Sequence, residues 1–263
     1  MLDHNRPLDT RFAAMLAGNG RLRGIFNTIP SPAIVEMCGY AGFDFIIIDN
    51  EHGAADLMTT EHMLRAARGS GIVPIVRCLP QDVGRTLDLG PSGLQIPMVG
   101  SAEEAAHLVR LIKYPHPDGK GGVSDGLRGS GFSSRAAGYA AYGGDAHAHR
   151  SNDGVTLTVQ IESPEGVANA AAIAAVPGIN AVFVGTHDLA HTMGHESNVQ
   201  HPAVQAAVEK TLKAIAAAGK CAGIPAPTAA DEERYASWGA RMFANGTAGP
   251  IMKALREAAK KTA

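Results

Sequence analysis

The segments FDFIIID at residues 43–49 and NAVFVG at residues 180–185 are the strongest indicators of fold in this chain. Each is a continuous apolar run rather than an alternation of apolar and polar residues. A strand needs such a run when both faces of its sheet are covered, as in parallel sheets flanked by helices. Both segments therefore predict buried strands of a parallel sheet.

Similar apolar runs alternate with longer helical segments on either side of these two. The expected strands are 23–29, 43–49, 72–77, 93–97, 155–162, 179–184, 221–224 and 240–244. The expected helices lie near 32–41, 57–69, 82–89, 101–113, 164–175, 202–218, 228–237 and 247–261. Such an α/β alternation predicts one (β/α)₈ TIM barrel over residues 1–263. A doubly wound open sheet is the alternative, although no GxGxxG motif follows the first strand.

A long segment at about 114–154 interrupts the alternation. It is dense in Gly and Ser (DGKGGVSDGLRGSGFSSR) and ends in GGDAHAHR. A loop of this length in a compact domain is usually functional or disordered. It is interpreted either as a flap over the barrel mouth or as a flexible insertion, and His147 and His149 within it are expected to face solvent.

Composition and charge exclude several classes of protein. The chain has 23 Lys+Arg against 25 Asp+Glu, a net charge of −2, so it lacks the basic surface that binds nucleic acids. No stretch reaches the roughly 18 apolar residues that cross a bilayer, and no signal peptide is visible. Three scattered cysteines do not make a disulfide framework. We therefore expect a cytoplasmic protein with no nucleic-acid or membrane partner.

Polar residues follow four of the expected strands. They are Asp49, Glu51 and His52 after the second strand, Arg77 after the third, Gln160 and Glu162 at the fifth, and Gly185, Thr186, His187 and Asp188 after the sixth. In a barrel of this kind the carboxyl ends of the strands meet at one mouth, where catalytic groups lie. The pattern predicts one site there.

Each of these side chains has a chemical role and a structural alternative. Glu162 and Asp188 stand on neighbouring strand ends and suit a hard divalent ion, although Asp188 could instead cap the next helix. His52 could be a general base oriented by a carboxylate, or a solvated loop histidine. Arg77 could bind a substrate carboxylate, or form an internal ion pair with Asp49 or Glu51.

Other arrangements are weaker. His187, His191 and His195 could share a helix face for zinc, but Gly194 interrupts the helix and favours surface histidines. No P-loop or nucleophile-elbow motif occurs. No strand is expected to end in lysine, so a Schiff-base mechanism lacks its nucleophile, and all the lysines are expected to be solvated.

Taken in order, the motifs resemble the HpcH/HpaI aldolases, which are class II, metal-dependent pyruvate aldolases. They are FDFIIIDNEH (43–52), PIVR (74–77), LDLG (87–90), IPMV (96–99), VQIE (159–162) and VFVGTHDLAHTMG (182–194). The resemblance covers roughly residues 20–260, and the combination is highly specific.

The resemblance implies roles for individual residues. Glu162 and Asp188 match the metal ligands, His52 matches the catalytic histidine, and Arg77 matches the arginine that holds pyruvate. Asp49 and Asp88 match the acidic residues that are associated with the histidine in the family. The residue that Asp88 matches comes from a neighbouring subunit. The positions that line the pyruvate site match Gln160, Gly185, Thr186 and His187. The resemblance also implies homohexamers in which the last helix is swapped between subunits.

The expected activity is that of a divalent-metal-dependent aldolase, using Mg²⁺, Mn²⁺ or Co²⁺ and no organic cofactor. It would cleave a 4-hydroxy-2-oxo acid into pyruvate and an aldehyde, or run the reverse condensation. One alternative is a citrate-synthase-like member that joins an oxaloacetate-derived enolate to another acceptor. A second is a non-catalytic protein that binds small acids, which would not need His52. Thr186 and His187 depart from the family pattern and bear on the choice of acceptor.

Overall fold

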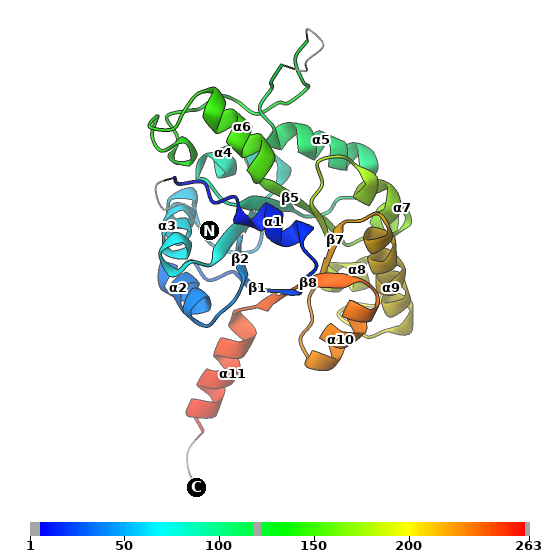
Figure 1. Ribbon diagram of the computed structural model, residues 1–263. Helices are drawn as coiled ribbons and strands as arrows, with labels where there is room; N and C mark the ends of the chain where they lie inside the picture. The colour runs from blue at the N-terminus through cyan, green and yellow to red at the C-terminus, as the bar shows by residue number, and fades with distance from the viewer. Residues whose placement is uncertain (1–5, 118–121, 261–263) are drawn as a thin grey trace.

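The computed structural model describes residues 6–117 and 122–260, and these form a closed barrel of parallel strands (Figure 1). Each strand pairs with the next in the sequence, and the last pairs with the first. The strands are β1 (Leu22–Asn27), β2 (Phe45–Asp49), β3 (Val73–Arg77), β4 (Gly93–Ile96), β5 (Thr156–Ile161), β6 (Ala181–Val184), β7 (Cys221–Ile224) and β8 (Ala240–Gly246). The predicted TIM barrel is confirmed.

Helices follow the strands, and all of them except α11 cover the outside of the barrel (Figure 1). They are α2 (Pro32–Tyr40), α3 (Leu57–Ser70), α4 (Val83–Asp88), α5 (Ala102–Ile112), α7 (Pro164–Ala175), α8 (Thr186–Thr192), α9 (Pro202–Ala217), α10 (Ala229–Ser237) and α11 (Ala248–Ala258). Several begin at side chains that cap the first turn. Ser101 and Glu104 form a reciprocal capping box at α5, and the hydroxyl of Ser163 accepts from the N–H of Gly166 at α7.

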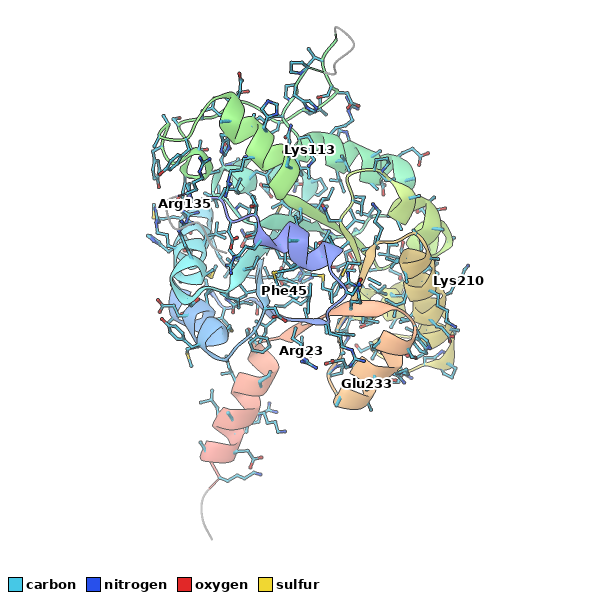
Figure 2. The ribbon with its side chains drawn as sticks, viewed as in Figure 1. Arg23, Phe45, Lys113, Arg135, Lys210 and Glu233 are labelled. Atoms are coloured by element: carbon cyan, nitrogen blue, oxygen red, sulfur yellow. The ribbon has the colours of Figure 1, made fainter. Side chains whose placement is uncertain are left out.

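The apolar core has two parts. The larger part lies between the strands and the outer helices. The smaller part fills the barrel interior, where Phe45, Ile47 and Ile75 meet Phe12 and Leu16 of an additional helix, α1 (Arg11–Ala17). This helix crosses the amino end of the barrel, with Phe45 behind it (Figure 2), and the rings of Phe12 and Phe45 lie 5.3 Å apart. Because α1 closes the amino end, the interior opens only at the mouth.

The segment 114–154 differs from the sequence interpretation. It contains a short 3₁₀ turn, η2 (Arg135–Ala137), and a helix, α6 (Asp145–Gly154). It connects the end of α5 to the start of β5, so it lies at the amino end of the barrel and not over its mouth. His147, expected in solvent, is buried against Tyr114 and Phe132 because α6 packs there, and burial lowers the pKa of its imidazole.

The last helix, α11, extends away from the barrel (Figure 1). None of its described residues is buried, and Met252 and Leu255 are exposed. Its first turn is fixed at the mouth, because Thr247 donates its backbone N–H to Phe26 O at 2.9 Å and its hydroxyl to Asn27 Oδ1 at 3.3 Å. The expectation that this helix is exchanged between subunits stays a prediction.

Candidate active site

The polar strand ends converge at the mouth of the barrel, as the sequence predicts for parallel strands. β2 and β3 place Asp49 directly beside Arg77 in the sheet register. Glu162 directly follows β5 and Gly185 directly follows β6, and the N–H of Gly185 donates to Ile161 O at 2.9 Å. Two groups of carboxylates result, one around Arg77 and one around Glu162.

The first group is a buried ion pair between Asp49 and Arg77. The guanidinium donates from Nε and Nη2 to the two carboxylate oxygens at 2.9 and 2.5 Å. Its Nη1 lies 3.0 Å from Glu51 Oε2, and its plane lies over the ring of Phe26 at 4.9 Å. Burial lowers the pKa of Arg77, but the hydrogen bonds and charge of Asp49 outweigh burial and raise it. The internal ion pair expected as an alternative therefore exists, and it locks the orientation of the guanidinium.

Glu51 and His52 continue this group toward solvent. Asp49 Oδ1 accepts the backbone N–H groups of Glu51 and His52 at 3.1 and 3.3 Å, which fixes the turn after β2. The imidazole of His52 is exposed, with Nε2 3.9 Å from Glu51 Oε2. Burial raises the pKa of Glu51, while Arg77 opposes that rise. Glu51, and not Asp49, is thus the acid that the structure places beside the imidazole of His52.

The second group centres on Glu162, which is almost fully buried. Its Oε1 accepts the backbone N–H of Met98 at 2.7 Å, and its Oε2 accepts Nε2 of Gln160. Among the described residues it has no ion-pair partner. Burial raises the pKa of the Glu162 carboxyl to about 7, although the donors from Gln160 and Met98 oppose this. An isolated buried carboxylate is costly unless a cation neutralises it.

The residues after β6 complete this second group. A side chain at Gly185 would place its Cβ 2.5 Å from Glu162 Oε2, so only glycine leaves room for the carboxylate. Thr186 is buried in the first turn of α8, whereas His187 and Asp188 are exposed. Besides burial, which is the largest cause, the carboxylate of Asp188 raises the pKa of Glu162 and that of Glu51, so its charge acts on both acids.

Asp88 lies elsewhere. It is the last residue of α4, which leads back toward the amino end of the barrel. Its Oδ1 is 3.6 Å from Nη2 of Arg128, a buried arginine stacked on Tyr114 at 4.2 Å. Burial raises the pKa of Asp88, and Arg128 opposes that rise. Within one chain the structure therefore brings Asp88 to Arg128 and the insertion, and not to the mouth.

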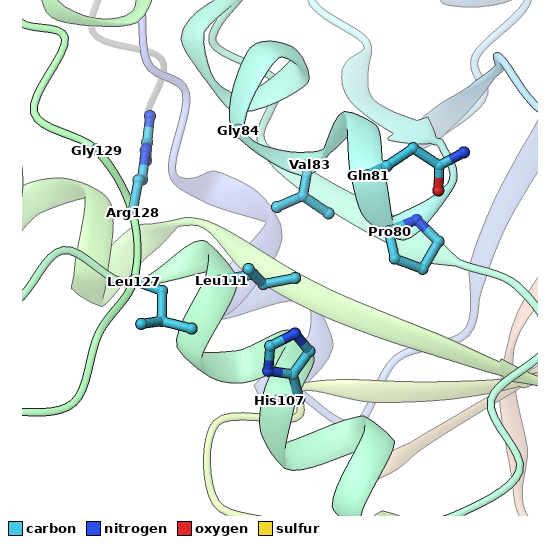
Figure 3. A pocket seen from close by; sticks show the side chains of 9 residues that line it. All are labelled: Pro80, Gln81, Val83, Gly84, His107, Leu111, Leu127, Arg128 and Gly129. Atoms are coloured by element: carbon cyan, nitrogen blue, oxygen red, sulfur yellow. The ribbon is translucent and has the colours of Figure 1, made fainter.

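Two features outside the mouth bear on the alternatives. Lys113 is partly buried, contrary to the expectation that all the lysines are solvated. Burial lowers its pKa, and its Nζ donates to Asn152 O. It stands at the end of α5, away from the strand ends. A cavity of about 370 Å³ lies between α4, α5 and residues 127–129 (Figure 3). None of the mouth residues lines it, so neither feature belongs to the site.

The residues at the mouth fit a hard divalent cation. Glu162 and Asp188 offer carboxylate oxygens, which Mg²⁺ and Mn²⁺ prefer, and Mg²⁺ usually keeps several waters besides one or two carboxylates. The unpaired charge of buried Glu162 is the observation that calls for a cation. No group of three or more His, Cys, Asp or Glu side chains suited to a metal occurs in residues 6–117 and 122–260, so His187, His191 and His195 are not gathered into one there.

Comparison with known proteins shows the family of this chain. The family model described as HpcH/HpaI aldolase/citrate lyase matches residues 23–253. The chain belongs to this family. Relatives named 5-keto-4-deoxy-D-glucarate aldolase, from Shigella dysenteriae and Escherichia coli, are 38% identical over 247 residues, which are 93% of this chain and 93% of theirs. The resemblance drawn from the sequence motifs is confirmed, and the chain is an enzyme of the aldolase and lyase class.

Solved structures of the family share the architecture. A family member from Burkholderia cenocepacia superposes with a TM-score of 0.88 at 32% identity, covering 95% of this chain and 98% of that one. A protein described as citrate synthase SbnG superposes with a TM-score of 0.78 at 28% identity, covering 91% of each chain. The family acts on small-molecule substrates. Within the described residues, no helix is long and apolar enough to cross a membrane.

Sequence reasoning missed two contributors to the site. Gln95 lies on β4 inside the barrel and contacts Gln160, but its segment GLQIP reads as an ordinary apolar strand. The backbone N–H of Met98 donates to Glu162, and Met98 has a left-handed φ of 59°. This conformation is uncommon for a residue other than glycine, so the sequence does not predict it. The one sequence signal is Gln95 itself, a glutamine inside an otherwise apolar run.

Proposed function

We propose that this enzyme is a divalent-metal-dependent aldolase that cleaves a 4-hydroxy-2-oxo acid into pyruvate and an aldehyde, and catalyses the reverse condensation. The observation that carries the proposal is the buried carboxylate of Glu162, which has no ion-pair partner among the described residues and interacts electrostatically with Asp188 and with the fixed guanidinium of Arg77. Glu162 and Asp188 would hold Mg²⁺, Mn²⁺ or Co²⁺. The cation would supply positive charge at the carboxylate and keto oxygens of the 2-oxo acid.

The chain's own residues would bind and orient the substrate. Arg77 offers the N–H groups that are not bound to Asp49, and their direction is set by that ion pair. They would hold the pyruvyl oxygens and stabilise the charge that grows there. Gln160, Gly185, Thr186 and His187 would line the pyruvate side, where the absence of a side chain at Gly185 leaves the carboxylate of Glu162 uncovered.

His52 would take the proton from the 4-hydroxyl group, directly or through one water. Its exposed imidazole can reach an incoming substrate, and its Nε2 lies 3.9 Å from Glu51 Oε2. We expect His52→Ala to lower kcat for cleavage by about 10²–10⁴-fold, the usual contribution of a general base. Exchange of the methyl protons of pyruvate should fall less, since it does not involve the 4-hydroxyl. A kcat for cleavage within threefold of wild type would rule out this role.

The relatives suggest which substrate to test first. Proteins 38% identical to this chain are named for 5-keto-4-deoxy-D-glucarate, so we propose a hydroxylated 2-oxo diacid. The citrate synthase at 28% identity supports a second candidate function, in which an enolate from oxaloacetate is joined to another acceptor. Turnover with 5-keto-4-deoxy-D-glucarate, with pyruvate plus a panel of aldehydes, and with oxaloacetate would separate the two.

We further propose a cytoplasmic homohexamer in which α11 is exchanged between subunits and Asp88 serves a neighbouring subunit's His52. The exposed apolar residues of α11 and the place of Asp88 far along α4 from its own mouth support this. Mass determination in solution tests the hexamer. A chain cut before α11 should form smaller particles; unchanged particle mass would contradict the exchange.

The decisive experiment for the reaction class is removal of the cation. EDTA should abolish cleavage, and Mg²⁺, Mn²⁺ or Co²⁺ should restore it. Incubation with pyruvate and borohydride should leave the mass of the protein unchanged, because an imine needs a lysine at the substrate carbonyl. A pyruvyl adduct on a lysine together with inactivation would overturn the proposal.

A further inference from the structure

A chain of buried amides links β4 to the carboxylate of Glu162. Gln95 donates from Nε2 to Oε1 of Gln160 at 2.6 Å, and Gln160 donates from Nε2 to Oε2 of Glu162. All three side chains are at least nine-tenths buried. They stand on the neighbouring strands β4 and β5, on the face that points into the barrel.

The direction of the hydrogen bonds between these three side chains is determined by Glu162. An ionised carboxylate can only accept hydrogen bonds, so Glu162 requires the NH₂ group of Gln160 to face it. The carbonyl oxygen of Gln160 then faces Gln95 and requires a donor there. Without that donor, nothing on this side would prevent the amide of Gln160 from turning over and presenting its oxygen to the carboxylate.

Gln95 is not explained by stability. Its own Oε1 is buried and has no hydrogen-bond partner among the described atoms. A buried acceptor left without a donor costs about 1–3 kcal/mol, which offsets what the hydrogen bond to Gln160 contributes, so this amide brings no clear gain in stability over an apolar side chain. Its neighbours Leu94 and Ile96 show that the strand otherwise carries apolar residues.

We infer that Gln95 is a positioning residue for the cation site, acting through Gln160. It holds the Gln160 amide in the one orientation that donates to Glu162, and so fixes the direction in which the carboxylate faces Asp188. The inference rests on the proposed function, because it takes Glu162 to be a metal ligand. Partners of this kind that orient a ligand typically contribute 10–100-fold to metal affinity.

The test uses the full-length protein stripped of metal and titrated with Mn²⁺ by calorimetry. Gln95→Met removes the donor and keeps the length of the side chain, and Gln95→Leu is the second variant if the first folds poorly. Thr158→Val is the matched control: Thr158 also lies inside the barrel, paired with Gln95 in the sheet register, and its Oγ1 is buried without a partner.

We expect Gln95→Met to weaken Mn²⁺ binding by about tenfold. The Tm of its metal-free form should stay close to that of wild type, because one buried acceptor without a donor, Oε1 of Gln95, is exchanged for another, Oε1 of Gln160. The electron paramagnetic resonance spectrum of bound Mn²⁺ should broaden. Thr158→Val should leave the Kd within twofold. Binding by Gln95→Met within twofold of wild type, or a weakening matched by a lowered Tm, would overturn the inference.

A double variant tests the route of the effect. Gln95→Met should add less than twofold to the loss caused by Gln160→Leu, since the amide it positions is already absent. Additive losses would show that Gln95 acts independently and would also overturn the inference. Glu162→Gln separates the two levels: if it leaves Mn²⁺ binding unchanged, the metal assignment itself is wrong, whereas loss of binding there with normal binding by Gln95→Met rejects only the role of Gln95.

Discussion

The two carboxylate groups at the mouth are neighbours with opposite electrostatics. Asp49 is buried and fully paired, because Arg77 donates to both of its oxygens. Glu162 is buried to a similar degree but receives only neutral donors, from Met98 and Gln160. The pKa of Glu162 is accordingly raised to about 7. The comparison shows that the protein neutralises one acid internally and leaves the other for a cation from outside.

The largest effect should come from removing the second group. The double variant Glu162→Gln/Asp188→Asn should lose the calorimetric signal of Mn²⁺ binding and about 10³-fold or more of its turnover, the scale of a lost electrostatic stabiliser. The Asp49–Arg77 pair should persist, so the near-ultraviolet circular dichroism should not change. Retained binding of Mn²⁺ in this variant would mean that the cation is held elsewhere.

Single neutralisations should affect stability in opposite directions. Asp49→Asn leaves the buried guanidinium of Arg77 without its full partner and should lower the free energy of unfolding by about 3–5 kcal/mol. Glu162→Gln removes an unpaired buried charge, so the metal-free protein should be as stable as wild type or more stable at pH 8. Urea unfolding of both metal-free variants checks this. Equal destabilisation of the two variants would show that other groups of the protein already neutralise the charge of Glu162.

Crowding of the second group should weaken cation binding. The Cβ of Gly185→Ala would lie 2.5 Å from Glu162 Oε2 and 2.8 Å from Gln160 Nε2, so the carboxylate must move. We expect a loss of about 10–100-fold in Mn²⁺ affinity, measured by calorimetry. Gly249→Ala on α11 is the control, because a Cβ there meets no atom within 4 Å, and its affinity should equal that of wild type.

The smallest effect is a pH dependence. The pKa of Glu162 in the metal-free protein is raised from 4.5 to about 7, so below pH 7 the cation must displace a proton. The Kd for Mn²⁺ should rise by about tenfold per pH unit below 7. The same shift means that metal-free wild type loses stability, relative to Glu162→Gln, as the pH rises from about 4.5 through 7. A Kd that is flat between pH 5.5 and 7 would contradict the raised pKa.

Much of the barrel and of the first carboxylate group was predictable from sequence. Continuous apolar runs such as FIIID define buried parallel strands, and strand direction alone brings Asp49, Arg77, Glu162 and Asp188 to one end. Family motifs added the identity of the chemistry. These inferences succeed because they depend on local pattern and on chain direction, both of which the sequence contains.

The rest depends on contacts between distant segments. The assignment of Glu51 as the acid beside His52 needs the side-chain directions after β2, which depend on the turn that Asp49 holds. The burial of His147 could be predicted only if α6 were predicted first. The Ala, His and Asn residues of that helix form no clear apolar stripe. Of the two interpretations of the insertion, a flap over the mouth is wrong, because the direction of α5 leads to the opposite end of the barrel.

The helix across the amino end of the barrel has a consequence for biosynthesis. Arg241 of β8 fixes the end of α1. It donates to the carbonyl oxygens of Leu16 and Gly20 at 2.6 and 2.9 Å, and it follows Leu16 by 225 residues in the sequence. At 5–20 residues per second, the ribosome needs about 10–45 s to make that stretch. Phe12 and Leu16 therefore leave the ribosome well before the arginine that fixes them exists. The nascent chain therefore carries this apolar helix while the strands of the barrel are being made, and can bury it in its final place only after β8 has been synthesised.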